Sequence, residues 1–103
     1  MSNMKPESQN ASLETALRVK DAKVADLESL ISELQGNASV LDRRIKAEET
    51  RTKIEDPIHP AYSNFAKSAL RRRDNLRASA AVLKVKLEEA IRERDDALAQ
   101  LNR

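Results

Sequence analysis

The fold is decided at residues 56–62, which read Asp56-Pro57-Ile58-His59-Pro60-Ala61-Tyr62. Two of the chain's three prolines stand in this stretch, between two long segments that both carry a helical pattern. Proline lacks the backbone N–H and clashes with the preceding turn, so a helix arriving from the N-terminal side should end near Glu55 or Asp56. Pro60 suits the first turn of a second helix, where its missing donor costs nothing. The stretch therefore predicts a reversal between two helices.

The segment before the prolines carries a heptad repeat. Its predicted a positions are Leu17, Val24, Ile31, Ala38 and Ile45, and its d positions are Leu13, Lys20, Leu27, Leu34 and Leu41. A run of this length with a single polar interruption is typical of a coiled coil, because the 3.5-residue repeat keeps one seam turned toward a partner helix. Gly36 falls at an outward f position, and the repeat passes through it unchanged.

A second heptad repeat follows the prolines. Its predicted a positions are Ala66, Arg73, Ala80, Leu87, Arg94 and Leu101, and its d positions are Tyr62, Ala69, Leu76, Leu83, Ala90 and Ala97. Because the connection is short, the two helices should run antiparallel. The sequence therefore predicts an all-α fold, a long two-helix antiparallel coiled-coil hairpin. We expect a flexible lead-in over residues 1–10 and a hairpin over 11–103, with helices at about 11–55 and 62–102 and a tip at 56–61.

The relative slide of the two helices can also be predicted. In the favoured slide, the numbers of two residues that face each other across the helices add up to about 121. Glu48 of the first helix then faces Arg73 of the second. The alternative slide, in which these numbers add up to about 114, would make Lys20 and Arg94 face each other in the seam. That arrangement is costly because like charges would be partly desolvated. Acidic residues at the e positions of the first helix support antiparallel packing, since the e positions of the second helix include Arg77 and Lys84.

Composition excludes several classes of protein. The 19 basic and 17 acidic residues leave a net charge of only +2, which argues against a dedicated nucleic-acid binder. The absence of cysteine excludes disulfides and thiolate metal sites. No apolar run is long enough to cross a bilayer, and residues 1–10 lack the apolar core of a signal peptide. We therefore expect a soluble intracellular protein.

The tip offers little for catalysis. His59 is the only histidine, and a zinc site typically needs three or four protein ligands. No nucleophile and base pair, Gly-rich phosphate loop or acidic cluster is visible, so we expect no catalytic, cofactor or metal site. Asp56 or His59 is expected to cap the second helix. Tyr62 and Phe65 are expected to close the end of the seam; the alternative is direct contact with a partner.

A basic cluster follows the tip. It contains Lys67, Arg71, Arg72, Arg73 and Arg77, with Asp74 as the one acid among them, and it is called the basic shoulder below. Three interpretations remain open: an ordinary solvated helix face, a site for an acidic protein surface, or a nucleic-acid site. The last lacks a recognition motif or stacking platform. Arg73 is expected to lie in the seam between the helices, so fewer charges of the shoulder face outward.

The second helix carries more apolar surface than one seam can use. The predicted oligomer face consists of Ala78, Val82, Val85, Ile91 and Leu98. Contiguous exposed apolar patches commonly mark interaction surfaces, and a two-helix hairpin buries little surface by itself, so we expect a homo-oligomer. The alternative is that alanine simply raises helix propensity on a solvated face, which explains Val82 and Val85 less well.

The tip and shoulder together resemble a known family. The segment D-P-x-H-x-A-Y-x-x-F-A-K followed by R-R-D-N-L resembles alphaproteobacterial, especially rhizobial, members of the FliJ family of flagellar type III export proteins. The matching residues are Asp56, Pro57, His59, Ala61, Tyr62, Phe65, Ala66, Lys67, Arg72, Arg73, Asp74, Asn75 and Leu76.

The resemblance implies a non-enzymatic coiled-coil hairpin in the cytoplasm, peripheral at the inner face of the membrane. It implies protein partners, namely the export ATPase, the export gate protein and substrate chaperones. The composition and hydropathy described above argue against nucleic acid and against membrane insertion. The predicted partner-binding residues at the tip and shoulder are Asp56, Pro57, His59, Tyr62, Phe65, Lys67, Arg71, Arg72, Asp74 and Asn75. The alternative function is a general coiled-coil adaptor or scaffold that self-associates and is unconnected with secretion.

Overall fold

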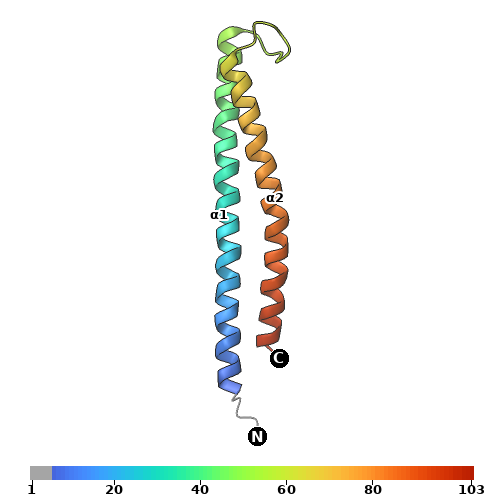
Figure 1. The fold of residues 1–103 in the computed structure, drawn as a ribbon. Helices are drawn as coiled ribbons and strands as arrows, with labels where there is room; N and C mark the ends of the chain where they lie inside the picture. The colour runs from blue at the N-terminus through green and yellow to red at the C-terminus, as the bar shows by residue number, and fades with distance from the viewer. Residues whose placement is uncertain (1–5) are drawn as a thin grey trace. The chain divides into compact units, whose positions relative to one another are not determined.

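The chain is a hairpin of two α-helices, α1 (Pro6–Thr52) and α2 (Asn64–Leu101), which run in opposite directions (Figure 1). The computed structural model describes residues 6–103, with side chains described from residue 9 onward. The predicted all-α, antiparallel two-helix hairpin is confirmed. The described residues contain no β-strand, and neither helix carries an apolar stretch of the length that a bilayer crossing requires.

Helix α1 begins earlier than the sequence predicts. Residues 6–10 are helical, whereas a flexible lead-in was expected up to residue 10. Pro6 is the first helical residue, a position at which the missing N–H leaves no hydrogen bond unmade. The proline is therefore compatible with the helix. Residues 1–5 of the expected lead-in lie outside the described residues.

Helix α1 ends at Thr52, a few residues before the predicted end near 55. The Thr52 hydroxyl donates to the Glu48 carbonyl oxygen at 3.0 Å and accepts the Ile54 N–H at 3.4 Å. Lys53 follows with a φ of 59°, the left-handed conformation that commonly terminates helices. The connection therefore spans residues 53–63, longer than the tip predicted at 56–61, and α2 begins at Asn64 instead of residue 62.

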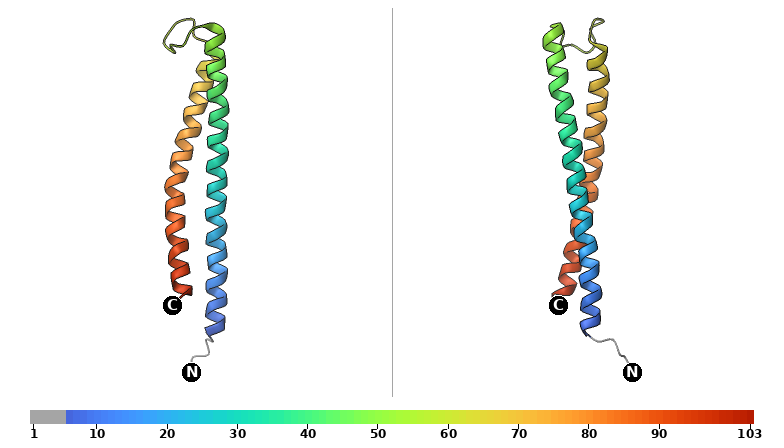
Figure 2. Two further views of the ribbon diagram at one scale, coloured as in Figure 1. Left: turned by 180° about the vertical axis from the view of Figure 1, so that it is seen from behind. Right: turned by 90° about the vertical axis from the view of Figure 1, so that its left-hand side faces the viewer.

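Internal contacts divide the hairpin into two compact units, each containing parts of both helices. Unit 1 combines the described residues up to Ser29 with Leu83–Arg103, and unit 2 is the continuous segment Leu30–Val82. Unit 2 includes the loop between the helices, which Figure 2 shows from two further sides. The candidate site lies in unit 2.

The core of each unit consists of the predicted heptad positions. In unit 2 the buried side chains are Ile31, Ala38, Ile45, Tyr62, Ala66, Ala69 and Ala80. In unit 1 they are Val24, Ala90 and Ala97. The remaining a and d positions are half-buried. Every position assigned to the seam is therefore turned toward the other helix, which confirms both heptad assignments.

The predicted slide of the helices is wrong. In unit 2, Arg73 Nη1 lies 2.7 Å from Asp42 Oδ1, while Glu48 pairs with Arg51 of its own helix. In unit 1, Arg94 Nε lies 3.9 Å from Asp21 Oδ1. Both cross-helix pairs have residue numbers that sum to 115, close to the rejected value of 114 and far from 121.

The rejected slide is tolerated because acidic residues lie close to Lys20 and Arg94, the two cations that were expected to repel each other. Lys20 Nζ lies 3.9 Å from Glu93 Oε2 on the other helix, and Arg94 reaches both Asp21 and Asp95. Lys20 and Arg94 remain about one third exposed, so their charged ends stay hydrated while their stems cover the seam. The desolvation cost on which the prediction rested is therefore largely avoided.

Candidate functional site

The loop of unit 2 consists of two consecutive turns with the same pattern of hydrogen bonds. The His59 N–H donates to the Asp56 carbonyl at 3.0 Å, and the Tyr62 N–H donates to the His59 carbonyl at 2.9 Å. Pro57 and Pro60 each occupy the second position of a turn, which their fixed φ favours. Pro60 therefore belongs to a turn, and the prediction that it opens the second helix is wrong.

Side chains at the first position of each turn stabilise the loop. Asp56 Oδ1 accepts the Ile58 N–H, and His59 Nδ1 accepts the Ala61 N–H, both at 3.0 Å. These bonds occupy Asp56 and His59 within the loop, so the prediction that one of them caps the second helix is wrong. Ser63 is the cap, since its hydroxyl accepts the Ala66 N–H at 3.2 Å.

Tyr62 joins the loop to α1. Its ring is buried, and its hydroxyl donates to Glu49 Oε2 at 2.6 Å. Burial, reinforced by this bond to a carboxylate, raises the pKa of Tyr62 to about 12. Tyr62 therefore closes the end of the seam as predicted, and it belongs to the hairpin's core, not to a surface that a partner could reach.

Phe65 does not close the seam beside Tyr62. Its side chain is 50% exposed, on the outside of the first turn of α2. Ile58, in the loop, is 89% exposed and was not among the predicted site residues. Unit 2 therefore presents two bulky apolar side chains to solvent near the loop. Ile58 could be recognised only once the turns were known, because they make it the outward third position of the first turn.

Arg73 is the one member of the basic shoulder that turns into the seam. Its guanidinium is hydrogen-bonded to Asp42 across the hairpin and to Asp74 at 3.2 Å on its own helix. The hydrogen bond from Arg73 holds the pKa of Asp42 below its usual value, and the bond to Asp42 raises the pKa of Arg73. Arg77 Nη2 also lies 4.0 Å from Asp42. The prediction that Arg73 lies in the seam between the helices is confirmed.

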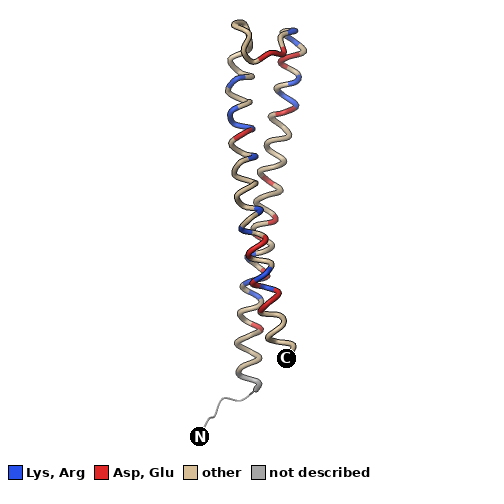
Figure 3. The backbone as a smooth tube through the Cα atoms, turned by 90° about the vertical axis from the view of Figure 1, so that its right-hand side faces the viewer, with Lys and Arg blue, Asp and Glu red and all other residues tan. Residues whose placement is uncertain are grey.

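The rest of the basic shoulder faces solvent. The side chains of Lys67, Arg71 and Arg72 are exposed, and none forms an ion pair with any residue that the structure describes. Asp74 and Asn75 are exposed on the same helix. Figure 3 shows how the basic and acidic residues are distributed along the backbone. Three exposed cations of the shoulder are therefore unpaired among the described residues, and the fourth, Arg77, lies near Asp42.

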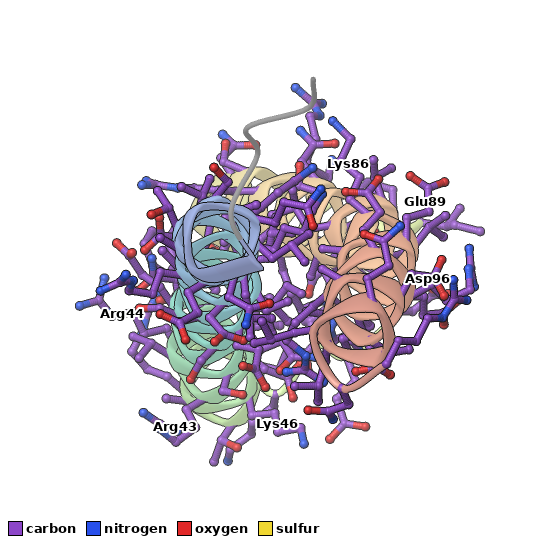
Figure 4. All side chains as sticks on the ribbon, turned by 90° about the horizontal axis from the view of Figure 1, so that it is seen from below. Arg43, Arg44, Lys46, Lys86, Glu89 and Asp96 are labelled. Carbon is purple, nitrogen blue, oxygen red and sulfur yellow. The ribbon has the colours of Figure 1, made fainter. Side chains whose placement is uncertain are left out.

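A groove in unit 2 extends from the shoulder onto α1, and the sequence did not predict it. It has a volume of about 240 Å³ and is lined by Asn37, Val40, Leu41, Arg44, Arg72 and Leu76. Figure 4 labels Arg44 at the edge of α1, together with the neighbouring Arg43 and Lys46. Recognising this groove required the correct slide of the helices, because only that slide brings Arg44 and Arg72 to the same level.

The predicted oligomer face is largely accessible along α2. Val82 is 57% exposed, Val85 is 55% exposed and Leu98 is 42% exposed. Ala78 is also exposed, whereas Ile91 is half-buried. Other outward positions of α2 are charged; Figure 4 labels Lys86, Glu89 and Asp96 on the outside of this helix. Val82 and Val85 are therefore the bulkiest apolar side chains that α2 exposes at its centre.

The titratable residues of the described chain do not assemble into a metal site. Among residues 9–103, whose side chains the structure describes, no three His, Cys, Asp or Glu side chains come together as potential ligands. His59 directs Nδ1 into the loop. The chemistry that this part of the molecule offers is therefore that of exposed cations beside exposed apolar groups, which suits binding to another macromolecule.

Comparison with protein-family models, with curated proteins and with solved structures finds no match for the chain. The resemblance to FliJ-type proteins therefore rests on the sequence of the tip and shoulder.

Proposed function

We propose that the chain is a non-enzymatic component of a flagellar type III export apparatus, and that it binds other proteins through the loop and basic shoulder of unit 2. The partners are those the resemblance implies: the export ATPase, the export gate protein and substrate chaperones. The protein acts in the cytoplasm, at the inner face of the membrane. The observation that carries the proposal is the combination, within unit 2, of exposed Ile58 and Phe65 with unpaired Lys67, Arg71 and Arg72.

The structure supports a binding role in two ways. Apolar side chains flanked by arginines are typical of the residues that dominate protein–protein interfaces. The loop that holds Ile58 and leads into α2 is constrained by two proline turns, two side-chain bonds to the backbone and the Tyr62–Glu49 bond. A preorganised surface loses less conformational entropy on binding than a flexible one.

The proposal is tested by co-purification of the tagged chain with the export ATPase and gate protein of the same organism. Wild-type chain should retain a partner, and the double substitution Arg71→Glu/Arg72→Glu should release it. Arg18→Glu/Arg92→Glu is the matched control, since both arginines are exposed, lack ion pairs among the described residues and lie in unit 1. Failure of wild-type chain to retain either protein would overturn the proposal.

The second candidate is a self-associating scaffold without export partners. It is favoured by the exposure of Val82 and Val85 on α2, which no feature of the export proposal requires. The co-purification experiment distinguishes the two candidates, because a scaffold of this kind would recover only further copies of itself.

A further inference from the structure

The groove of unit 2 brings together two arginines from different helices. In the observed slide, Arg44 of α1 and Arg72 of α2 occupy facing g positions, and both line the groove. Neither guanidinium forms an ion pair with a described residue. Facing like charges on paired helices destabilise them, whereas opposite charges at these positions select and orient the partner helix.

The corresponding positions in unit 1 follow the usual rule. There, Lys23 of α1 and Glu93 of α2 face each other, and their Nζ and Oε2 atoms lie 3.9 Å apart. The opposite side of unit 2 also follows the rule, because Asp42 pairs with both Arg73 and Arg77. The pair of arginines at the groove therefore differs from these opposite-charge pairs.

The lining of the groove is partly apolar. Val40, Leu41 and Leu76 form its apolar floor and are half-buried, so part of each side chain remains accessible; Asn37 and the two arginines complete the lining. A phosphate backbone would use the arginines and leave this floor uncovered. A helix that carries carboxylates beside a bulky apolar residue would use both, since arginine binds carboxylates through paired hydrogen bonds.

We propose that this groove is a docking site for an acidic amphipathic helix of a partner protein. Carboxylates of the incoming helix pair with Arg44 and Arg72, and an apolar side chain one turn along that helix covers Val40 and Leu76. The incoming negative charge removes the repulsion between the arginines. The inference deepens the proposed function, because Arg72 belongs to the basic shoulder, and it defines the chemistry of the partner segment.

The test uses the whole chain and a synthetic probe, so it needs no export component. The probe is a fluorescein-labelled helical peptide with glutamate and leucine on one face, and its binding is measured by fluorescence anisotropy at fixed salt. Arg44→Glu/Arg72→Glu should weaken binding about tenfold or more. The charge-matched control Arg18→Glu/Arg92→Glu should stay within about twofold. Equal losses in both variants would overturn the proposal, because binding would then depend on net charge alone.

Further probes separate this occupant from the others. Replacing the probe's glutamates with glutamine, or its leucines with serine, should each weaken binding, as should Val40→Gln in the chain. A single-stranded oligonucleotide that displaces the probe and is insensitive to Val40→Gln would overturn the proposal in favour of phosphate binding. Loss of probe binding as the chain self-associates would also overturn the proposal, because a second copy of the chain would then occupy the groove.

A measurement without any ligand tests the electrostatic premise. Arg44→Glu creates an opposite-charge pair with Arg72, so the midpoint of thermal unfolding should rise by about 1–4 °C at low salt, although probe binding falls. A residue needed for the hairpin itself would give the opposite result. A fall in the midpoint would therefore overturn the assignment of Arg44 and Arg72 to a partner.

Discussion

Tyr62 and Arg73 show how single residues join the two helices of unit 2. Each is a seam residue whose polar end reaches an acid of α1, Glu49 for Tyr62 and Asp42 for Arg73. The sequence predicted both as seam residues from their heptad positions. It could not predict their acceptors, because those depend on the slide of the helices and the favoured slide was wrong.

The first prediction concerns the ionisation of Tyr62. Its pKa in the folded chain is raised to about 12 from an ordinary value of 10.0, so the neutral form stabilises the fold. That contribution is fully present below about pH 10 and is lost as the pH rises through about 12. Because Tyr62 is the only tyrosine and the chain lacks tryptophan, absorbance at alkaline pH should show one late transition.

Two controls accompany this titration. The urea-unfolded chain should titrate near pH 10, the ordinary value for tyrosine. Glu49→Gln should lower the midpoint in the folded chain, because it removes the carboxylate that opposes tyrosinate formation. A folded-state midpoint near 10 would show that the Tyr62 hydroxyl is exposed.

The second prediction concerns Asp42 at acid pH. The hydrogen bond from Arg73 lowers the pKa of Asp42, so ionised Asp42 stabilises the fold at neutral pH. This contribution is lost as the pH falls below about 3.9, the ordinary value for aspartate, through the lowered pKa. Thermal unfolding followed by circular dichroism should therefore show a falling midpoint in this range.

Asp42→Asn should reduce stability at neutral pH and flatten the acid part of the curve. The matched control is Asp26→Asn, since Asp26 is exposed and has no ion pair among the described residues. Its curve should keep the wild-type slope. An unchanged slope in Asp42→Asn would mean that the Asp42–Arg73 pair contributes little.

At the scale of elements, the heptad pattern was sufficient to predict two antiparallel helices and the residues between them. The loop could not be predicted equally well. Pro57 and Pro60 signalled a break, but the side chains of Asp56 and His59 bind backbone groups locally, which extends the non-helical segment to Ser63. Such bonds compete with helix formation, and the sequence pattern alone does not decide which of them forms.

The slide of the helices was mispredicted for a physical reason of general interest. Lys20 and Arg94 are not two charges buried against each other, because Asp21 and Glu93 lie beside them. Partial exposure and neighbouring acids reduce the cost of that arrangement. The groove and its two arginines were missed as a direct consequence, because the wrong slide places Arg44 and Arg72 at different levels.

The third prediction concerns α1 as an element. Gly36 lies in an exposed part of the helix, and a Cβ built there would meet nothing within 4 Å. Gly36→Ala should therefore stabilise the chain by about 0.8–1 kcal/mol, the difference in helix propensity between the two residues. Urea unfolding should show a higher midpoint with an unchanged slope. A lower midpoint would show that position 36 has a role other than continuing the helix.

At the scale of the whole molecule, the fourth prediction is self-association. Val82 and Val85 expose more than half of their surface on α2, and burying apolar surface favours association. Light scattering at micromolar concentration should give a mass above the 11.6 kDa of one chain. The double substitution Val82→Ser/Val85→Ser should return the mass to that of one chain.

A matched control distinguishes this surface from general loss of apolar area. Val19→Ser removes a valine that is 66% exposed on α1 and should leave the mass unchanged. A wild-type mass of 11.6 kDa over the whole concentration range would contradict the prediction and would remove the scaffold from the two candidate functions.

The position of Tyr62 gives the chain a natural optical reporter. As the sole tyrosine of a tryptophan-free protein, it makes the intrinsic fluorescence a signal from unit 2, while unit 1 contributes none. Far-ultraviolet circular dichroism, by contrast, senses helix throughout the molecule. Overlaying the two melting curves reveals whether both units lose their structure in one cooperative event, without any label or mutation.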